Sequence, residues 1–190
     1  MRTRRKTRDA RTHGISWVLI IILVSLCVVG YGGYRGVLAL FDSWTDDLPD
    51  VNDADAFQLA KKTTILANDG STVLAELYLE NREPITIDKV SQYVLNGTVA
   101  TEDERFYQHK GVDLQGIARA VAVNLTGGQE GASTITQQFV RNTLLSSEMN
   151  DITIKRKVRE MELAIQLEKI YGKDEILMMY LNTINYGDGC

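Results

Sequence analysis

The hydrophobic and polar positions of this 190-residue chain divide it into regions of different pattern. Residues 15–34 carry no charge, and a helix of that length crosses roughly 30 Å of hydrocarbon. Residues 42–55 are polar and acidic, whereas from residue 63 onward apolar residues recur first at strand spacing and then at helix spacing. The pattern therefore predicts a basic tail, a transmembrane helix, an acidic linker and a folded domain, at residues 1–14, 15–34, 35–62 and 63–190.

Charge along the chain supports the membrane interpretation of the first region. Residues 1–14 hold six Lys/Arg and one Asp, a net charge of +5, and the rest of the chain carries −9. A basic head before an apolar run is typical of a membrane protein and not of a nucleic-acid-binding one. The positive cluster predicts a cytoplasmic N-terminus and an extracellular domain. A cleaved signal peptide is the alternative, but the apolar run is longer than a typical signal core and no small-x-small site follows it.

The acidic segment 42–55 contains six aspartates and one proline. A calcium-binding loop is one interpretation, but the spacing lacks the glycine and the final glutamate of such a loop. A solvated acidic stalk agrees better with this composition.

The predicted domain begins with a small β element and continues as helices. Two β-rich runs in residues 63–77 flank Asn68-Asp69-Gly70, which is a hairpin signal. Helices follow over 113–125, 133–145 and 151–171, and a fourth starts at Lys173. Their predicted N-caps are Asp113, Ser133 and Asp151. The sequence thus predicts a mainly α domain with a small N-terminal β element.

Two of these helices have an apolar stripe that we expect to face the core. In the first helix the stripe consists of Leu114, Ile117, Val121 and Leu125. In the third it consists of Ile154, Val158, Met161 and Ile165. A second stripe of the third helix is half apolar and contains Glu160, Ala164, Leu167 and Tyr171.

Glu102 is the first candidate for chemistry, because it follows an apolar-leaning helix and precedes Phe106. A carboxylate at such a position can be partly desolvated, which suits a general acid or base. The residue types alone equally allow a surface or capping acid beside Arg105.

Residues 131–139, with the sequence GASTITQQF, are a candidate anion cradle. Free backbone N–H groups at a helix N-terminus bind anions, and Ser133 and Thr134 add hydroxyl groups there. Gln137, Gln138 and Arg141 follow within two turns. An ordinary capped helix is the alternative, and no Gly-Lys-Ser/Thr P-loop is present.

Glu160 follows a basic cluster that includes Arg156 and Lys157. The i, i+4 spacing of Arg156 and Glu160 allows a surface ion pair, whereas the half-apolar stripe of Glu160 favours a cleft. A basic cluster would suit a pyrophosphate, but a solvated charged face remains open on these residues alone. The chain has no paired Cys/His spacing, so a zinc site is not expected.

Four stretches match, in order, the motifs of one known family. The first, Glu-Asp-x-x-Phe-x-x-His-x-Gly, is matched by Glu102, Asp103, Phe106, His109 and Gly111. The second, Gly-x-Ser-Thr-Ile-x-Gln-Gln, is matched by Gly131, Ser133, Thr134, Ile135, Gln137 and Gln138. The third, Arg-Lys-x-x-Glu, is matched by Arg156, Lys157 and Glu160. The fourth, Lys-x-x-Ile-Leu-x-x-Tyr-Leu-Asn, is matched by Lys173, Ile176, Leu177, Tyr180, Leu181 and Asn182. On these residues the chain resembles the peptidoglycan glycosyltransferases, the domain of class A penicillin-binding proteins and of monofunctional transglycosylases.

The resemblance implies a lysozyme-like, mainly helical fold and an inverting transfer of sugar at the outer membrane surface. The implied substrates are lipid II as acceptor and the growing glycan strand as donor, joined by a β-1,4 link. Glu102 matches the catalytic base and Glu160 the second catalytic acid, which in this family stands near a divalent cation, Mg²⁺ or Mn²⁺. The implied substrate-binding residues are Asp103, Phe106, His109, Ser133, Thr134, Gln137, Gln138, Arg141, Arg156 and Lys157.

The resemblance also sets expectations for partners and for the extent of the domain. Other cell-wall synthesis proteins are expected partners, and nucleic acid is not. Because the family domain normally has further helices, we expect residues 63–190 to be an incomplete domain. Two other functions remain open: a lysozyme-like lytic muramidase, and an inactive membrane-anchored fragment that only binds partners.

Overall fold

The computed structural model describes residues 2–53, 57, 63–77 and 82–187. The chain divides into two compact units, Met1–Asp46 and Asp47–Cys190. Each unit is described by itself.

The first unit is a single helix, α1, which runs from Arg2 to Thr45. Its segment Leu23–Thr45 is long and apolar enough to cross a membrane, and no other described helix is. The helix continues through residues 35–45, which were expected to belong to the linker. The physical reason is that these residues contain no proline and include several good helix formers, so nothing ends the helix before Asp46.

The first residues of the second unit, from Asp47 onward, pack on the domain. The sequence had predicted a solvated acidic stalk here. Val51 is only 3 % exposed and belongs to the core. Phe57 stacks on Phe139 with ring centroids 5.6 Å apart. Arg159, buried in the domain, forms an ion pair with Asp47. The acidic composition hid these apolar anchors, and the other residues of the predicted linker, 54–56 and 58–62, lie outside the described residues.

The small β element is confirmed as an antiparallel hairpin of β1 (Thr63–Leu66) and β2 (Val73–Leu77). Gly70 takes the positive φ of 71° that its turn requires. The Asp69 carboxylate accepts hydrogen bonds from Thr72 and from the Ser71 backbone, and these bonds lower the pKa of Asp69 to about 2. The turn predicted from Asn68-Asp69-Gly70 is therefore stabilised by its own side chain.

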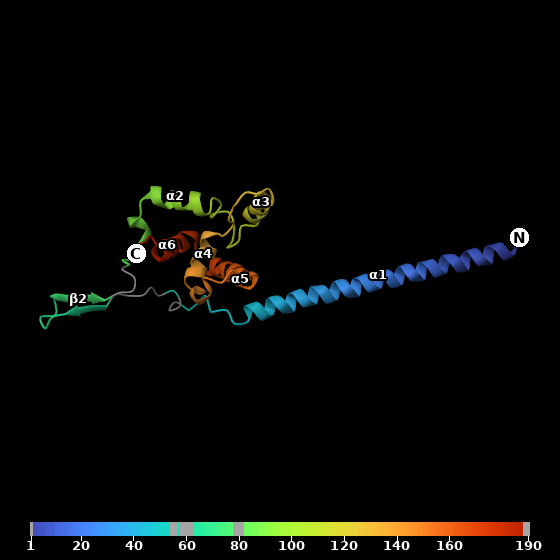
Figure 1. The fold of residues 1–190 in the computed structure, drawn as a ribbon, viewed down its shortest axis with the longest axis horizontal. Coiled ribbons are helices and arrows are strands. Elements are labelled where there is room, and N and C mark those ends of the chain that lie inside the picture. Colours follow the sequence, from blue (N-terminus) through green and yellow to red (C-terminus); the bar gives the residue numbers. More distant parts are fainter. Residues whose placement is uncertain (1, 54–56, 58–62, 78–81, 188–190) are drawn as a thin grey trace. The chain divides into compact units, whose positions relative to one another are not determined.

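Helices are the main regular structure in the rest of the second unit, as far as the structure describes it, so the prediction of a mainly α fold is confirmed (Figure 1). Five are α-helices: α2 (Gln92–Glu102), α3 (Leu114–Leu125), α4 (Ile135–Asn142), α5 (Ile154–Ile170) and α6 (Lys173–Thr183). Two short 3-10 helices, η2 (Ile87–Lys89) and η3 (Ser146–Glu148), lie in the connections. This helical body beside a small hairpin is consistent with the lysozyme-like fold that the resemblance implies.

Two of the three predicted N-caps were placed wrongly. Asp113 caps α3 as expected, by accepting from the Gly116 backbone. The cap of α4 is Thr134 and not Ser133, because the Thr134 hydroxyl is the one that accepts from Gln137 N. The cap of α5 is Thr153 and not Asp151, since Thr153 accepts from Arg156 N. Both helices thus begin later than the sequence suggested.

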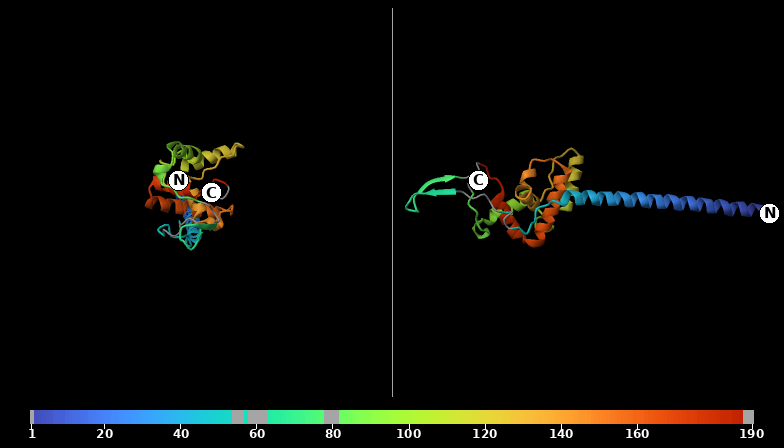
Figure 2. Two further views of the ribbon diagram at one scale, coloured as in Figure 1. Left: turned by 90° about the vertical axis from the view of Figure 1, so that its left-hand side faces the viewer. Right: turned by 90° about the horizontal axis from the view of Figure 1, so that it is seen from below.

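The core forms where α5 and α6 pack against α4 (Figures 1 and 2). Its members come mainly from these helices and include Ile135, Phe139, Val140, Leu163, Leu167, Ile176, Leu177, Tyr180 and Leu181. Phe106 joins them from the loop after α2. The helix bearing the two glutamines is thus held from two sides.

The apolar stripes expected to face the core do not do so. In α5 the buried residues are Arg159, Glu160, Leu163, Ala164 and Leu167, whereas Ile154 is exposed. In α3 the buried residues are Gly116 and Ala120, whereas Leu125 is 83 % exposed. Both predictions failed because periodicity counts apolar residues. In α3 small residues form the inward face, and in α5 the inward face carries the charge-compensated Glu160 beside Leu163 and Leu167.

Candidate active site

Glu102 is the last residue of α2, and its side chain is exposed. Its Oε2 accepts a hydrogen bond of 2.9 Å from Nε2 of Gln138, which lies on α4. It does not pair with Arg105, because Arg105 binds Asp113 instead. Glu102 is therefore an accessible carboxylate that one amide of α4 holds in place.

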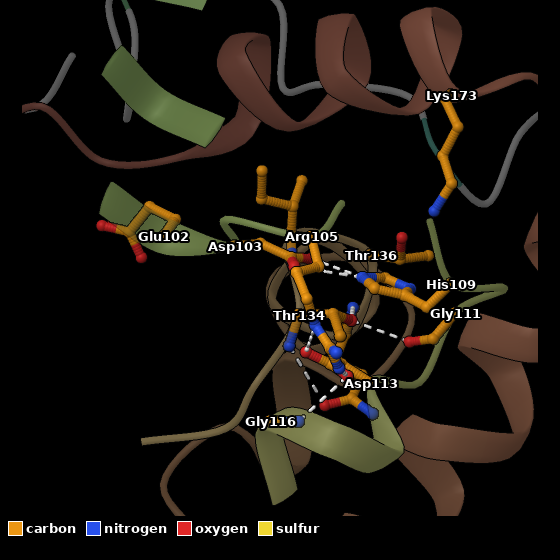
Figure 3. A network of polar contacts seen from close by, with 12 residues as sticks. Glu102, Asp103, Arg105, His109, Gly111, Asp113, Gly116, Thr134, Thr136 and Lys173 are labelled. Carbon is orange, nitrogen blue, oxygen red and sulfur yellow. Dashed lines mark hydrogen bonds and ion pairs between the residues drawn. The ribbon is translucent and has the colours of Figure 1, made fainter. Parts of the chain in front are cut away.

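Asp103 follows directly and is buried (Figure 3). Both of its carboxylate oxygens lie within 3.0 Å of His109 Nε2. One of them also accepts from the backbone N–H of Ile135 at 3.1 Å. This N–H belongs to the first turn of α4 and has no partner within the helix. Asp103 thereby ties the loop after Glu102 to the start of α4.

Phe106 is buried and His109 is partly buried in that loop. The Phe106 ring is fully buried and lies under the Lys173 ammonium, 4.3 Å from the ring centroid. His109 packs edge-on against Phe106. This placement supports a positioning role for Asp103, Phe106 and His109, since their side chains face the protein interior. Direct contact of these three residues with substrate stays a prediction.

Thr134 joins the same loop to α4 from a second point. Its hydroxyl donates to the Gly111 carbonyl oxygen at 2.7 Å and accepts from Gln137 N at 3.1 Å. The Gln137 side chain completes a capping box by accepting from Thr134 N. The amide nitrogen of Gln137, Nε2, is buried and has no hydrogen-bond partner among the described residues. Because the group is buried, direct contact of Gln137 with substrate stays a prediction.

Lys157, on α5, connects the start of α4 with Glu160. Its Nζ lies 2.9 Å from Ser133 Oγ, 3.0 Å from Gln137 Oε1 and 3.1 Å from Glu160 Oε2. Burial, assisted by the nearby positive charges of Arg141 and Arg156, lowers the pKa of Lys157 to about 8. Lys157 thus brings positive charge beside the N-terminus of α4, whereas Arg141 lies in the last turn of that helix.

Glu160 is completely buried, and its ion pair with Arg156 has the predicted i, i+4 spacing. Arg156 and Lys157 take one carboxylate oxygen each. Among the described residues, no group of three or more His, Cys, Asp and Glu could hold a metal ion. A divalent cation at Glu160 would have to displace two cationic side chains, so this donor set does not fit the expected metal.

A polar cavity of about 340 Å³ contains part of the predicted site. Its lining does not include Gln137, Gln138, Arg141, Arg156, Lys157 or Glu160. It lies between the C-terminal end of α2 and the loop before α4, and Glu102, Gly131, Ser133 and Thr134 are among its lining residues. A more apolar cavity of about 450 Å³, beside Val94 and Leu181, contains none of the predicted site residues. The first cavity is the one whose chemistry matches the predicted site.

The sequence analysis did not assign a role to Tyr180, although the fourth motif contains it. Tyr180 is buried in α6, and its hydroxyl donates to Gln138 Oε1 at 3.2 Å. Gly111 was also left without a role, and its φ of +85° was not visible in the sequence. The motif matches were the only signal that could have indicated either residue.

Comparisons with known proteins agree with this picture. A family model described as Transglycosylase matches residues 70–190. The chain is 39 % identical over 175 residues to penicillin-binding protein 1F of Bacillus subtilis (strain 168), covering 91 % of this chain and 23 % of that protein. It is 39 % identical over 170 residues to penicillin-binding protein 1A of Escherichia coli (strain K12), covering 88 % and 19 %. The chain therefore spans about a fifth to a quarter of the length of these relatives.

Proposed function

Because this chain belongs to the transglycosylase family, we propose that it is a peptidoglycan glycosyltransferase that polymerises lipid II into β-1,4-linked glycan strands and releases undecaprenyl pyrophosphate. The observation that carries the proposal is one cavity lined both by the accessible carboxylate of Glu102 and by the hydroxyl residues at the start of α4. A glycosyl transfer needs a base for the incoming hydroxyl and positive groups for the leaving diphosphate.

Glu102 supplies the base. In the proposed step it accepts the proton of the acceptor sugar hydroxyl, whose oxygen forms the new bond to the anomeric carbon of the donor. The bond from that carbon to the diphosphate oxygen breaks, and the diphosphate leaves with the electron pair. Attack from the face opposite the leaving group inverts the anomeric centre. The exposure of Glu102 supports this assignment, because a base must reach the proton that it takes.

The groups around the start of α4 receive the leaving diphosphate. Lys157 supplies positive charge and Ser133 a hydroxyl group, Gln137 orients Lys157 through its amide oxygen, and Arg141 adds positive charge from the last turn of α4. Donors that are already oriented stabilise charge that develops in the transition state without reorganising. Buried Glu160 holds Arg156 and Lys157 in place, which gives the second acid a positioning role without a metal ion.

A membrane position follows from the proposed substrate. A lipid-linked sugar stays in the bilayer, and Leu23–Thr45 of α1 is long and apolar enough to cross it. Because basic residues favour the cytoplasmic side of a membrane helix, the basic N-terminus supports an outer position for the domain. Proteins of cell-wall synthesis that share this surface are the proposed partners.

The test is Glu102→Gln in the detergent-solubilised protein, with lipid II as substrate. Loss of a general base lowers the rate by about 10²- to 10⁴-fold. The matched control is Glu162→Gln, an acid of α5 that accepts a hydrogen bond from Gln166 of the same helix and does not line this cavity. We expect the control to polymerise at the wild-type rate.

Other outcomes would point to other functions. Sugar release from purified cell wall without lipid II would favour a lytic muramidase. Wild-type polymerisation by Glu102→Gln would remove Glu102 from the role of base. If the wild-type protein neither polymerises lipid II nor releases sugar from cell wall, a domain that only binds partners would be favoured.

A further inference from the structure

Tyr180, Gln138 and Glu102 form a chain of hydrogen bonds from α6 through α4 to the end of α2. The Tyr180 hydroxyl donates to Gln138 Oε1 at 3.2 Å, and Gln138 Nε2 donates to Glu102 Oε2 at 2.9 Å. Each of the three residues comes from a different helix. The carboxylate at the cavity is thus connected to a buried residue of the core.

The donor and acceptor pattern allows only one orientation of the Gln138 amide. An ionised carboxylate only accepts hydrogen bonds, so the NH₂ group of Gln138 must face Glu102. The amide oxygen then faces Tyr180 and needs a donor, which the phenol O–H supplies. If the amide turned over, its oxygen would face the carboxylate and repel it. Tyr180 therefore favours the orientation in which Gln138 donates to Glu102.

Tyr180 is suited to hold this orientation because it is itself fixed and stays protonated. Its side chain is only 3 % exposed and belongs to the core. Burial and the negative charge of Glu102 raise the pKa of Tyr180 to about 12, whereas the positive charge of Arg141 opposes them. The phenol thus remains a donor throughout the physiological pH range.

The chain of bonds also distinguishes the two oxygens of Glu102. Oε2 is occupied by the Gln138 amide. Oε1 accepts no hydrogen bond from any residue that the structure describes. The Gln138–Glu102 hydrogen bond fixes one oxygen and so restricts the rotation of the carboxylate. The other oxygen, Oε1, is left for a ligand.

We propose that Tyr180 is a positioning residue for the base, acting through Gln138 to hold the Glu102 carboxylate with Oε1 free to accept the proton. This inference rests on the proposed function, because it assumes that Glu102 is the base. Tyr180 is not a lining residue of the cavity, and in this proposal it does not contact the substrate.

The experiment compares Tyr180→Phe, Gln138→Met and the double variant in lipid II polymerisation by the solubilised protein. Tyr180→Phe removes the phenol oxygen and keeps the ring, so we expect kcat to fall about tenfold with KM unchanged, as for a loss of orientation. Gln138→Met should lower kcat at least as much. The kcat of the double variant should equal that of Gln138→Met alone, because the effects of residues that act through one series of hydrogen bonds are not additive.

The pH profile provides a second readout that a loss of stability alone would not move. A hydrogen bond to the charged form of an acid favours that form. Without Tyr180 directing the Gln138 amide, activity on the acid side of the profile should therefore reach half its maximum at a higher pH. The titratable and charged groups that act on Tyr180, namely Glu102, Arg141 on α4 and Tyr186 after α6, are unchanged in Tyr180→Phe.

Tyr186→Phe is the matched control. Its hydroxyl donates to the Leu181 carbonyl oxygen at 2.9 Å, so the substitution also removes a tyrosine hydrogen bond near the end of α6. It does not contact Gln138 or Glu102, and we expect wild-type kcat and an unchanged pH profile.

The outcomes separate this proposal from the proposed function. Wild-type activity of Glu102→Gln would overturn the proposed function and this inference with it. If Glu102→Gln is inactive but Tyr180→Phe keeps the wild-type kcat and pH profile, the inference alone is overturned. The same holds if the loss of kcat in the double variant equals the product of the two single losses. If Tyr180→Phe does not fold, Gln138→Met decides: an unchanged kcat and pH profile in that variant would refute the proposal.

Discussion

The backbone of Gly111 lies directly against the backbone of Ala164 in α5. A Cβ atom on Gly111 would stand 2.6 Å from both the carbonyl carbon and the carbonyl oxygen of Ala164. Gly111 also has a φ of +85°, which side-chain-bearing residues rarely adopt. Since Ala164 follows Glu160 by one helical turn, this contact places the loop after Glu102 against the helix that carries the second acid.

Gly111→Ala should therefore destabilise the domain strongly. The positive φ costs about 1 to 3 kcal/mol, and the clash with an immovable helix backbone adds a similar amount. The measurement is the free energy of unfolding of the solubilised protein, by denaturant titration. Gly127→Ala is the matched control, because Gly127 has a φ of +88° but a Cβ there would meet nothing within 4 Å. Equal losses in the two variants would show that the Ala164 contact contributes nothing.

Phe57 gives a second prediction, for the segment between α1 and the hairpin. Its ring stacks on Phe139 and meets Tyr171 edge-on, with centroids 5.6 and 6.1 Å apart. Because the ring is partly buried, Phe57→Ala should lower the free energy of unfolding by about 2 kcal/mol, less than for a fully buried Phe. Tyr93→Ala, which removes an aromatic ring that is 90 % exposed, should change it by no more than about 0.5 kcal/mol. If Phe57→Ala unfolds like the wild type, the segment does not contribute to the domain.

Local chemistry explains which features were predictable from the sequence. The hairpin follows from Asn68-Asp69-Gly70, and the start of α3 follows from Asp113, because both signals act over three or four residues. Two adjacent hydroxyl residues, Ser133 and Thr134, offer equal local signals for a cap. The choice between them is tertiary: Lys157, from α5, takes the Ser133 hydroxyl, and Thr134 is left to cap the helix.

The inward face of α5 illustrates the limit of periodicity. Ile154 is exposed and Glu160 is buried, opposite to their hydrophobicity. Glu160 can be buried because Arg156 and Lys157 neutralise it, and one of these partners is in turn bonded to Ser133 on another segment. A pattern of apolar positions does not contain such a network. The motif matches placed these residues at one site, but the contacts that connect them, above all that of Tyr180 with Gln138, needed the three-dimensional arrangement.

Lys157 leads to a prediction for anion binding. With its pKa lowered to about 8, its ammonium is charged at neutral pH and loses its proton as the pH rises. We expect the affinity for inorganic pyrophosphate, measured by calorimetry, to fall about tenfold between pH 7 and pH 9.5 relative to Lys157→Arg, since an arginine stays charged over this range. Titration of the ligand affects both proteins equally and cancels in the ratio. A ratio that does not change with pH would exclude Lys157 from the anion site.

The Lys157 ammonium also makes the free energy of unfolding depend on pH, and this quantity rises with pH where anion affinity falls. The pKa of Lys157 is about 8 in the folded protein, against an ordinary value of 10.5. Between these values the unfolded chain binds more protons than the folded one, so the free energy of unfolding rises with pH. Below about pH 8 the residue is charged in both states, and its destabilising contribution is constant. Thermal unfolding from pH 7.5 to 10 should therefore have a smaller rise with pH in Lys157→Met than in the wild type or in Lys169→Met, where the lost lysine is exposed. A slope in Lys157→Met equal to that of the wild type would mean that the cost of burying this charge in the folded state is negligible.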